Sequence, residues 1–127
     1  MFENLDIFKM SAAMARHAGQ RQAVIAQNVA NADTPDFVAR DLSPFADSFE
    51  NSNSTHQQRA TRERHLHGMV AGDPDAPMIK TPGDGAPNGN QVSLETELLK
   101  SVESKRQHDR ALAIYKSALQ VLRATTQ

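Results

Sequence analysis

The feature that most constrains the fold is the C-terminal stretch 93–125, which contains neither proline nor glycine. Nothing in its composition interrupts a helix. Ser93 is a plausible N-cap, and Glu95 and Glu97 favour the positive end of the helix dipole. At about 1.5 Å per residue, the helix would be roughly 50 Å long. That length is too great for a compact bundle of this size and is typical of a coiled coil or a helical assembly.

A heptad-like series of residues, alternating by four and three, runs along this predicted helix. Its middle is polar, at Ser101, Lys105 and His108, and we predict that these positions set the register between helices, as polar positions do in coiled coils. Its apolar members are the predicted helix-packing seam, which consists of Leu94, Leu98, Leu112, Tyr115, Leu119 and Leu122.

Residues 1–32 predict a second helix, because alanine, methionine, arginine and glutamine are frequent there. Only Gly19 interrupts it, and that glycine is suited to the close approach of another helix. His17 is expected at the surface. The predicted apolar stripe is thin, and it comprises Ile7, Met10, Met14, Ala18, Ile25 and Val29.

Residues 43–92 are polar and rich in Pro, Gly, Ser and Asn, so they bury too little apolar surface to offset chain entropy. Either this is a disordered insertion, or it orders only against neighbouring subunits. The predicted fold is therefore mainly α. The N-terminal part is 1–42, the irregular or short-β middle is 43–92, the C-terminal helix is 93–127, and helices 1–32 and 93–125 pair as one coiled-coil-like core.

The composition limits what the chain does. A net charge of −1 gives no preference for nucleic acid, and zero cysteines exclude disulfides. No stretch approaches the roughly 20 apolar residues of a membrane span. Residues 1–20 lack the uninterrupted apolar run of a cleavable signal peptide. An interaction protein that uses no cofactor, metal or small-molecule substrate is favoured over an enzyme.

Two clusters in the middle segment are weak candidates for chemistry. His56, His65 and His67 lack the convergent partners of a metal site, although stoichiometric bound metal would support one. The basic cluster at 59–64 has no interleaved aromatic residue on which a base could stack. We interpret both clusters as solvated loop residues.

The most specific local signal is the segment 26–42. Pro35 disfavours helix at Thr34, so the first helix is expected to end near residues 31–33. Residues 34–37 then predict a β-turn with Asp36 in third position, which fits type I. The alternation in 37–42 suggests a short extended piece. Asn28 and Asn31 are poor helix formers, and we expect their amides to contact the turn or another helix.

This segment resembles the N-terminal signature of bacterial flagellar axial proteins, which reads Asn-hydrophobic-Ala-Asn-x-x-Thr-x-Gly-aromatic. Asp36 stands where that family usually has glycine, and Phe37 where it usually has tyrosine. The continuation at 38–42 and the chain length most resemble the short rod proteins of the family. The resemblance implies an assembly motif made of Asn28, Ala30, Asn31, Thr34, Pro35, Asp36, Phe37, Arg40 and Asp41.

The resemblance implies a structural subunit of the proximal basal-body rod, which assembles helically, transmits torque and lines the export channel. Its partners would be other copies of itself, other rod proteins and the adjoining ring and export-gate proteins. Export would use the flagellar type III apparatus without a cleaved signal. The alternative is a soluble adaptor or export-binding module that uses an amphipathic C-terminal helix.

Overall fold

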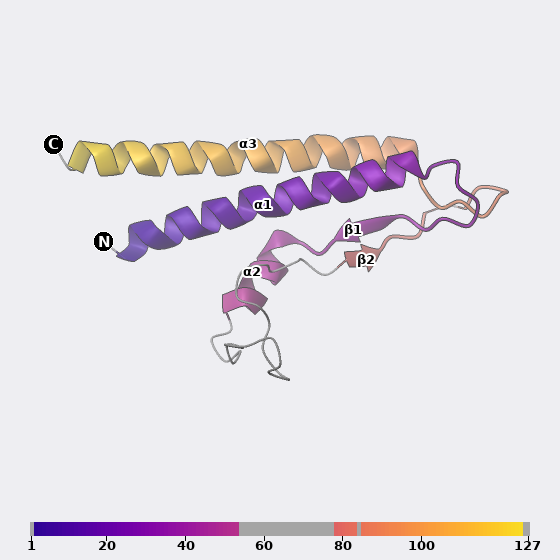
Figure 1. Cartoon of the computed structure of the whole chain (residues 1–127), viewed down its shortest axis with the longest axis horizontal. Coiled ribbons are helices and arrows are strands. Elements are labelled where there is room, and N and C mark those ends of the chain that lie inside the picture. The colour runs from indigo at the N-terminus through magenta and orange to yellow at the C-terminus, as the bar shows by residue number, and fades with distance from the viewer. Residues whose placement is uncertain (1, 54–77, 84, 126–127) are drawn as a thin grey trace, which may run out of the picture.

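The structure, a computed structural model, describes residues 2–53, 78–83 and 85–125. Two long helices dominate it, α1 (Phe2–Ala30) and α3 (Leu94–Thr125). They lie side by side and antiparallel, so that both ends of the chain lie at the same end of the pair (Figure 1). The predicted mainly α fold with paired terminal helices is confirmed.

Backbone and side-chain groups close the facing ends of the two helices. At the end of α1, the N–H of Asn31 donates to the carbonyls of both Gln27 and Asn28 at 3.1 Å. At the start of α3, Ser93 acts as the predicted N-cap, because its Oγ accepts the N–H of Thr96 at 3.4 Å. These contacts satisfy helix-terminal groups that have no partner within the helix.

The interface between α1 and α3 is a heptad seam of small residues. On α1, three buried positions, Ser11, Ala18 and Ile25, lie seven residues apart. Small side chains let the two backbones approach closely, and Ser104 Oγ donates to the carbonyl of Ala18 at 2.8 Å. Near the start of α1, Phe8 meets Tyr115 of α3 edge to face, with ring centroids 5.1 Å apart. The buried positions of α3 on this seam are Glu97, Ser104 and Ala111.

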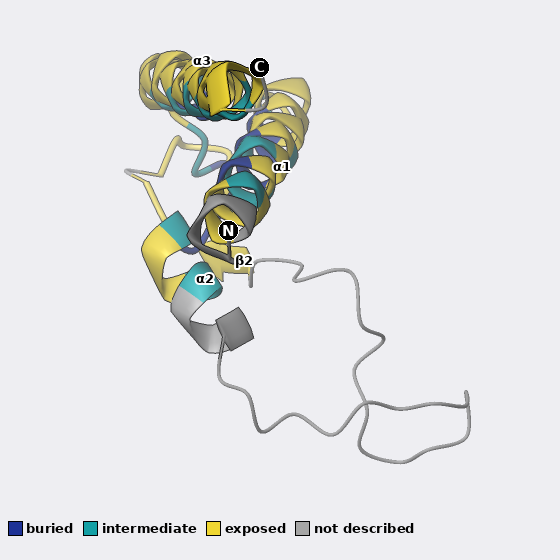
Figure 2. Cartoon of the chain, turned by 90° about the vertical axis from the view of Figure 1, so that its left-hand side faces the viewer, coloured by how far each residue is buried: buried dark blue, intermediate teal, exposed yellow. Residues whose placement is uncertain are grey.

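This seam lies one residue away from the stripe that the sequence predicts on α3. Leu94, Leu98 and Leu112 are exposed, whereas Leu119 and Leu122 are half-buried. The prediction that Leu94, Leu98 and Leu112 form the contact between the two helices of one chain is therefore wrong. The physical reason is that small and polar residues pack at the close crossing. Figure 2 shows the exposed outer side of α3.

The predicted stripe of α1 is corrected in the same way. Ala18 and Ile25 are buried, but Ile7, Met10 and Val29 are exposed. Ala18, Arg21 and Asn28 contact α3, so the face of α1 that meets α3 includes an arginine and an asparagine outside the predicted stripe. Hydrophobicity alone could not locate this face because polar residues that have partners occupy part of it.

The middle of the chain contains more structure than its composition suggests. Strand β1 (Arg40–Leu42) pairs antiparallel with β2 (Met78–Lys80), with Asp41 opposite Ile79. Between them, α2 (Phe45–Asn53) is a short helix within a segment predicted to be irregular. Its phenylalanines explain the difference, because Phe45 packs against both Phe49 and His17.

His17 is buried, contrary to the prediction that it lies at the surface. Its Nε2 is 2.8 Å from the carbonyl oxygen of Ser43, and its ring meets that of Phe45 edge to face. His17 therefore joins α1 to the start of α2.

Several sequence candidates lie outside the described residues, namely His56, His65, His67 and the basic cluster at 59–64. Within 2–53, 78–83 and 85–125, no group of three or more metal-ligating side chains converges. Over the same residues, no helix has the length and apolar character that crossing a bilayer requires.

Candidate functional site at the end of α1

The turn after α1 differs from its prediction. The N–H of Phe37 donates to the carbonyl of Thr34 at 3.4 Å, as expected for a β-turn over 34–37. Asp36, however, has a φ of 58°. A positive φ at the third position defines type II rather than type I turns and favours glycine there. The type I prediction was wrong, and Asp36 holds a conformation that glycine adopts without steric cost.

A second turn, at 86–90, packs against the first. The N–H of Asp36 donates to the carbonyl of Asn88 at 3.2 Å. Gly89 also has a positive φ, of 78°, and a Cβ added there would meet the carboxylate of Asp36. The two turns therefore contact so closely that a side chain at position 89 would displace that carboxylate.

Asn90 fastens this second turn to the end of α1. Its side chain is buried, and Nδ2 donates to the carbonyls of Asn31 at 2.9 Å and Thr34 at 2.6 Å. Its Oδ1 accepts the N–H of Val92 at 2.8 Å. One amide thus satisfies carbonyls at the helix end and directs the chain into α3.

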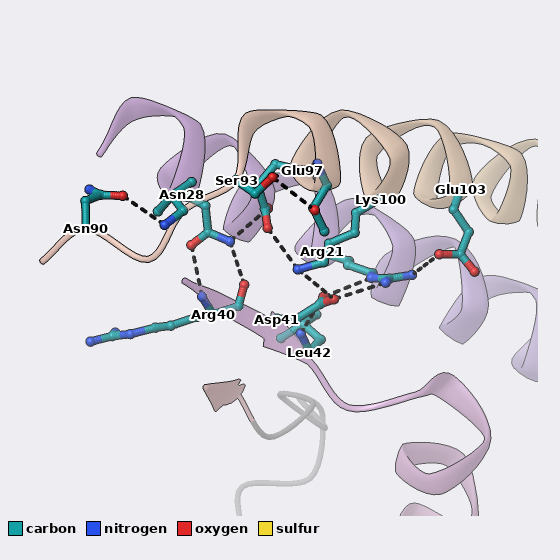
Figure 3. Close-up of polar contacts among 12 residues, drawn as sticks. Arg21, Asn28, Arg40, Asp41, Leu42, Asn90, Ser93, Glu97, Lys100 and Glu103 are labelled. Carbon is teal, nitrogen blue, oxygen red and sulfur yellow. Dashed lines mark hydrogen bonds and ion pairs between the residues drawn. The ribbon is translucent and has the colours of Figure 1, made fainter. Parts of the chain in front are cut away.

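Asn28 joins three elements. Its Nδ2 donates to the carbonyl of Arg40 at 2.6 Å, and its Oδ1 accepts the N–H of Arg40 at 3.1 Å. The same Nδ2 donates to Oε2 of Glu97 at 2.9 Å. Both Asn28 and Glu97 are 1% exposed. The expectation that the Asn28 amide contacts other elements is met, since it connects α1 with β1 and α3 (Figure 3).

Asp41 extends this contact into a charged cluster. Arg21 donates from Nε and Nη2 to its two carboxylate oxygens, at 2.9 and 3.0 Å. Lys100 Nζ lies 3.8 Å from Asp41 and 2.8 Å from Glu97. We refer to Arg21, Asn28, Asp41, Glu97 and Lys100 as the polar cluster; Figure 3 shows how its side chains converge.

Hydrogen bonding sets the charge state of Asp41. Burial acts to raise the pKa of its carboxyl group. The hydrogen bonds from Arg21 and from the N–H of Leu42, with the positive charges of Arg21 and Lys100, outweigh this effect and hold the pKa of Asp41 below its ordinary value. Conversely, the hydrogen bond to Asp41 raises the pKa of Arg21. The pair is therefore ionised at neutral pH.

The other members of the predicted motif have local or backbone roles here. Asn31 donates from Nδ2 to the carbonyl of Gln27 and accepts from Thr34 Oγ1, so its side chain stays within the turn. The carbonyl of Phe37, which is half-buried, accepts the N–H of Gln91 at 2.9 Å. The remaining motif residues, Ala30, Pro35 and Arg40, are exposed.

Sequence reasoning missed Glu97, Lys100, Arg21 and Asn90 as parts of this site. Glu97 was noted only for its favourable position near the helix dipole. One signal was available, since Glu97 and Lys100 lie three residues apart on the same helix face. The buried partner of Glu97 is Asn28, 69 residues away in sequence, and that of Lys100 is Asp41, 59 residues away. No periodicity predicts such contacts.

The cluster is suited to holding elements in place. Its charged groups are mutually paired, and its amides are used in contacts between elements. It positions the turn, the β1–β2 pair and the start of α3 relative to α1.

Comparison with known proteins places this architecture in a family. The flagella basal body rod protein family matches residues 8–37, which cover most of α1 and the turn. The flagellar basal body rod protein FlgB of Agrobacterium fabrum is 32% identical over 117 residues, covering 89% of this chain and 87% of the relative. FlgB of Proteus mirabilis is 33% identical over 75% of this chain and 73% of its own, and FlgB of Escherichia coli is 28% identical over 74% and 73%.

The chain belongs to the family of flagellar basal body rod proteins. It is a structural subunit of the proximal rod, as its FlgB relatives indicate, and the family is one of structural proteins rather than enzymes. The resemblance drawn from residues 28–42 is thereby confirmed.

Proposed function

We propose that the outer face of α3 packs this subunit against its neighbours in the rod. The observation that carries the proposal is the exposure of large apolar residues there: Leu98 is 67% and Leu99 is 72% exposed. Contiguous apolar surface of this kind marks interaction sites in soluble chains. Leu94, Leu98 and Leu112 of the predicted helix-packing seam are exposed and would pack between subunits. Its other members, Tyr115, Leu119 and Leu122, are less exposed than Leu98, and Tyr115 also contacts Phe8 within the subunit.

The weak interior of the single subunit supports the same proposal. Its α1–α3 seam is built from serine and alanine, which bury little apolar area. Long helices with so little interior surface gain stability when many copies cover them, because binding to the folded state shifts the folding equilibrium. We therefore propose that copies and other rod proteins stack helically into a shaft that transmits torque and lines the export channel.

The assembly motif has a supporting part in this proposal. Asn28 and Asp41 hold β1 against both long helices, whereas Arg40 and Pro35 lie exposed beside them. The exposed residues of this junction are then available to neighbours, which we propose include the adjoining ring and export-gate proteins. We also propose the division into 1–42, 43–92 and 93–127, in which the described helix and strand of the middle, α2 and β2, pack against the N-terminal part within the single chain.

We also propose that the chain reaches the periplasm-spanning rod through the flagellar type III apparatus without cleavage. The support is that the N-terminal residues are part of α1, where Phe8 packs on Tyr115. Cleavage within α1 after Phe8 would remove this contact. Mass spectrometry of the protein from isolated basal bodies should recover the peptide that contains Phe2, and recovery of a shortened N-terminus alone would contradict this route.

Substituting both exposed leucines tests the packing proposal. Leu98→Gln with Leu99→Gln should leave the helical far-UV signal of the full chain unchanged, because neither side chain is buried within the subunit. Swimming and recovery of the protein in basal bodies should fall to the level of the deletion strain. Glu95→Gln, an exposed change on the same turn of α3, is the matched control and should swim normally.

The alternative, a soluble adaptor, makes the opposite prediction. An adaptor would form a stable one-to-one complex with a partner and would be missing from isolated rods. Deleting residues 112–127 separates the two as well, since a rod subunit should then fail to assemble. Normal swimming after that deletion would contradict the rod proposal.

A further inference from the structure

The seam between α1 and α3 repeats itself every seven residues. Three of the buried positions of α1 lie at 11, 18 and 25, and the buried positions of α3 lie at 97, 104 and 111. Most of these residues are serine or alanine, so sliding one helix by a heptad exchanges one small side chain for another. Such a seam gives close packing but little discrimination between registers.

One contact in the seam does discriminate. Glu97 is the only acidic residue among the three buried seam positions of α3, and its carboxylate accepts from Asn28 at 2.9 Å and from Lys100 at 2.8 Å. A slide of one heptad moves Glu97 by about 10 Å along the axis, beyond reach of that amide. A buried carboxylate and amide would each lose a partner.

Asn28 is also held in place by β1. Its Oδ1 and Nδ2 pair with the N–H and carbonyl of Arg40, which leaves the remaining Nδ2 hydrogen directed at Glu97. Lys100 reaches Asp41 on the same strand, at 3.8 Å. The register of α3 is thus fixed relative to β1 as well as to α1 (Figure 3).

We propose that Glu97, paired with Asn28, determines the register of α3 on α1. This role is distinct from assembly and concerns the single chain. Selecting one register among several of similar packing is the best-established structural role of a buried polar contact between paired helices. In a rod subunit, the register fixes which residues of the two helices lie side by side on the outer surface.

Cysteine pairs measure the register directly, because the chain has no cysteine of its own. Gln22 donates to Ser101 at 2.8 Å, so Gln22→Cys with Ser101→Cys reports the native register. Gln22→Cys with Leu94→Cys or His108→Cys reports a slide of one heptad in either direction. Each full-length double variant is treated with a short bismaleimide linker, and the rate of crosslinking is measured.

With Glu97 present, the 22–101 pair should react much faster than the other two. In the Glu97→Leu background this preference should fall by about tenfold, the equivalent of one hydrogen bond to a charged group. Glu97→Gln, whose amide oxygen still accepts from Asn28, should restore it. Glu95→Leu, an exposed acidic residue on the same turn, is the matched control and should leave the preference unchanged.

Three results would overturn the proposal. The first is an unchanged preference for the 22–101 pair in Glu97→Leu, which would show that the small-residue seam determines the register. The second is loss of the helical far-UV signal in Glu97→Leu, which would make Glu97 a residue that the fold itself requires. A preference that falls equally in Glu97→Gln would likewise contradict the role of the Asn28 contact.

Discussion

Asn90 donates a hydrogen bond of 2.9 Å from its side-chain amide to the backbone carbonyl of Asn31, which precedes it by 59 residues. The same amide nitrogen reaches the carbonyl of Thr34 at 2.6 Å. The end of α1 is therefore closed by a residue of the short segment that leads into α3, which begins at Leu94. This contact couples the C-terminal boundary of one helix to the N-terminal boundary of the other.

Asn90→Ala should reduce the free energy of unfolding by about 2–3 kcal/mol, because it removes the hydrogen-bond partner of the carbonyls of Asn31 and Thr34 and of the N–H of Val92. Denaturant unfolding followed by far-UV circular dichroism measures the change. Asn88→Ala is the matched control, since its side chain is exposed and accepts one bond from Asn90. Equal losses in the two variants would contradict the role assigned to Asn90.

Acidification should weaken the subunit through Asp41. Its pKa is lower in the folded chain than in the unfolded chain. The stabilisation is therefore complete above the ordinary carboxyl pKa of about 4 and is lost as the pH falls below it, through the lower folded value. Asp41→Asn should flatten this part of the pH dependence and destabilise the chain at pH 7 by about 1–3 kcal/mol. If urea unfolding shows the same loss of stability at acidic pH in Asp41→Asn as in the parent chain, this assignment is contradicted.

Because Asp36 has a positive φ, replacing it with the glycine that the family usually has there should change the stability of the chain. Asp36→Gly should raise the free energy of unfolding by up to about 1 kcal/mol, because glycine adopts φ of 58° without a steric penalty. Gly89→Ala should destabilise the parent chain, since the added Cβ meets the Asp36 carboxylate.

In the Asp36→Gly background, Gly89→Ala should cost less, because the clash is gone and only the strain of φ at 78° remains. A double-mutant cycle on denaturant midpoints measures the difference. Additive effects would show that the two turns do not contact as the structure places them.

The sequence predicts the helices well and the contacts between them poorly. The absence of Pro and Gly from 93–125 and the proline at 35 are local signals, and they place both long helices within two residues of their observed bounds. The face of α3 that meets α1 depends instead on whether Glu97 finds Asn28, and no local pattern carries that information. The leucines are predicted at this interface because they are apolar, yet within one chain Leu94, Leu98 and Leu112 remain exposed.

The two asparagines of the motif should behave differently. Asn28→Ala removes contacts to Arg40 and Glu97 and should cost about 3 kcal/mol or more, because a buried charge loses a partner. Asn31→Ala removes only bonds within its own turn and should cost about 0.5–1 kcal/mol.

We expect Asn31→Ala to impair assembly more than helicity, since its fold contribution is small. Circular dichroism and swimming assays on the same variant compare the two. If both fall in proportion, Asn31 has only a structural role.

Gly19 gives a test in which stability and assembly should change in opposite directions. It lies on the wall of a groove of about 510 Å³ between α1 and α3, beside Gln22, Val102 and His108. A Cβ added at Gly19 would meet no atom within 4 Å, so Gly19→Ala should stabilise the subunit by about 0.5–1 kcal/mol. If the groove receives a neighbouring helix, swimming should fall in Gly19→Ala and fall further in Gly19→Leu. Both replacements are good helix formers. Normal swimming in Gly19→Leu would show that the groove stays open in the rod.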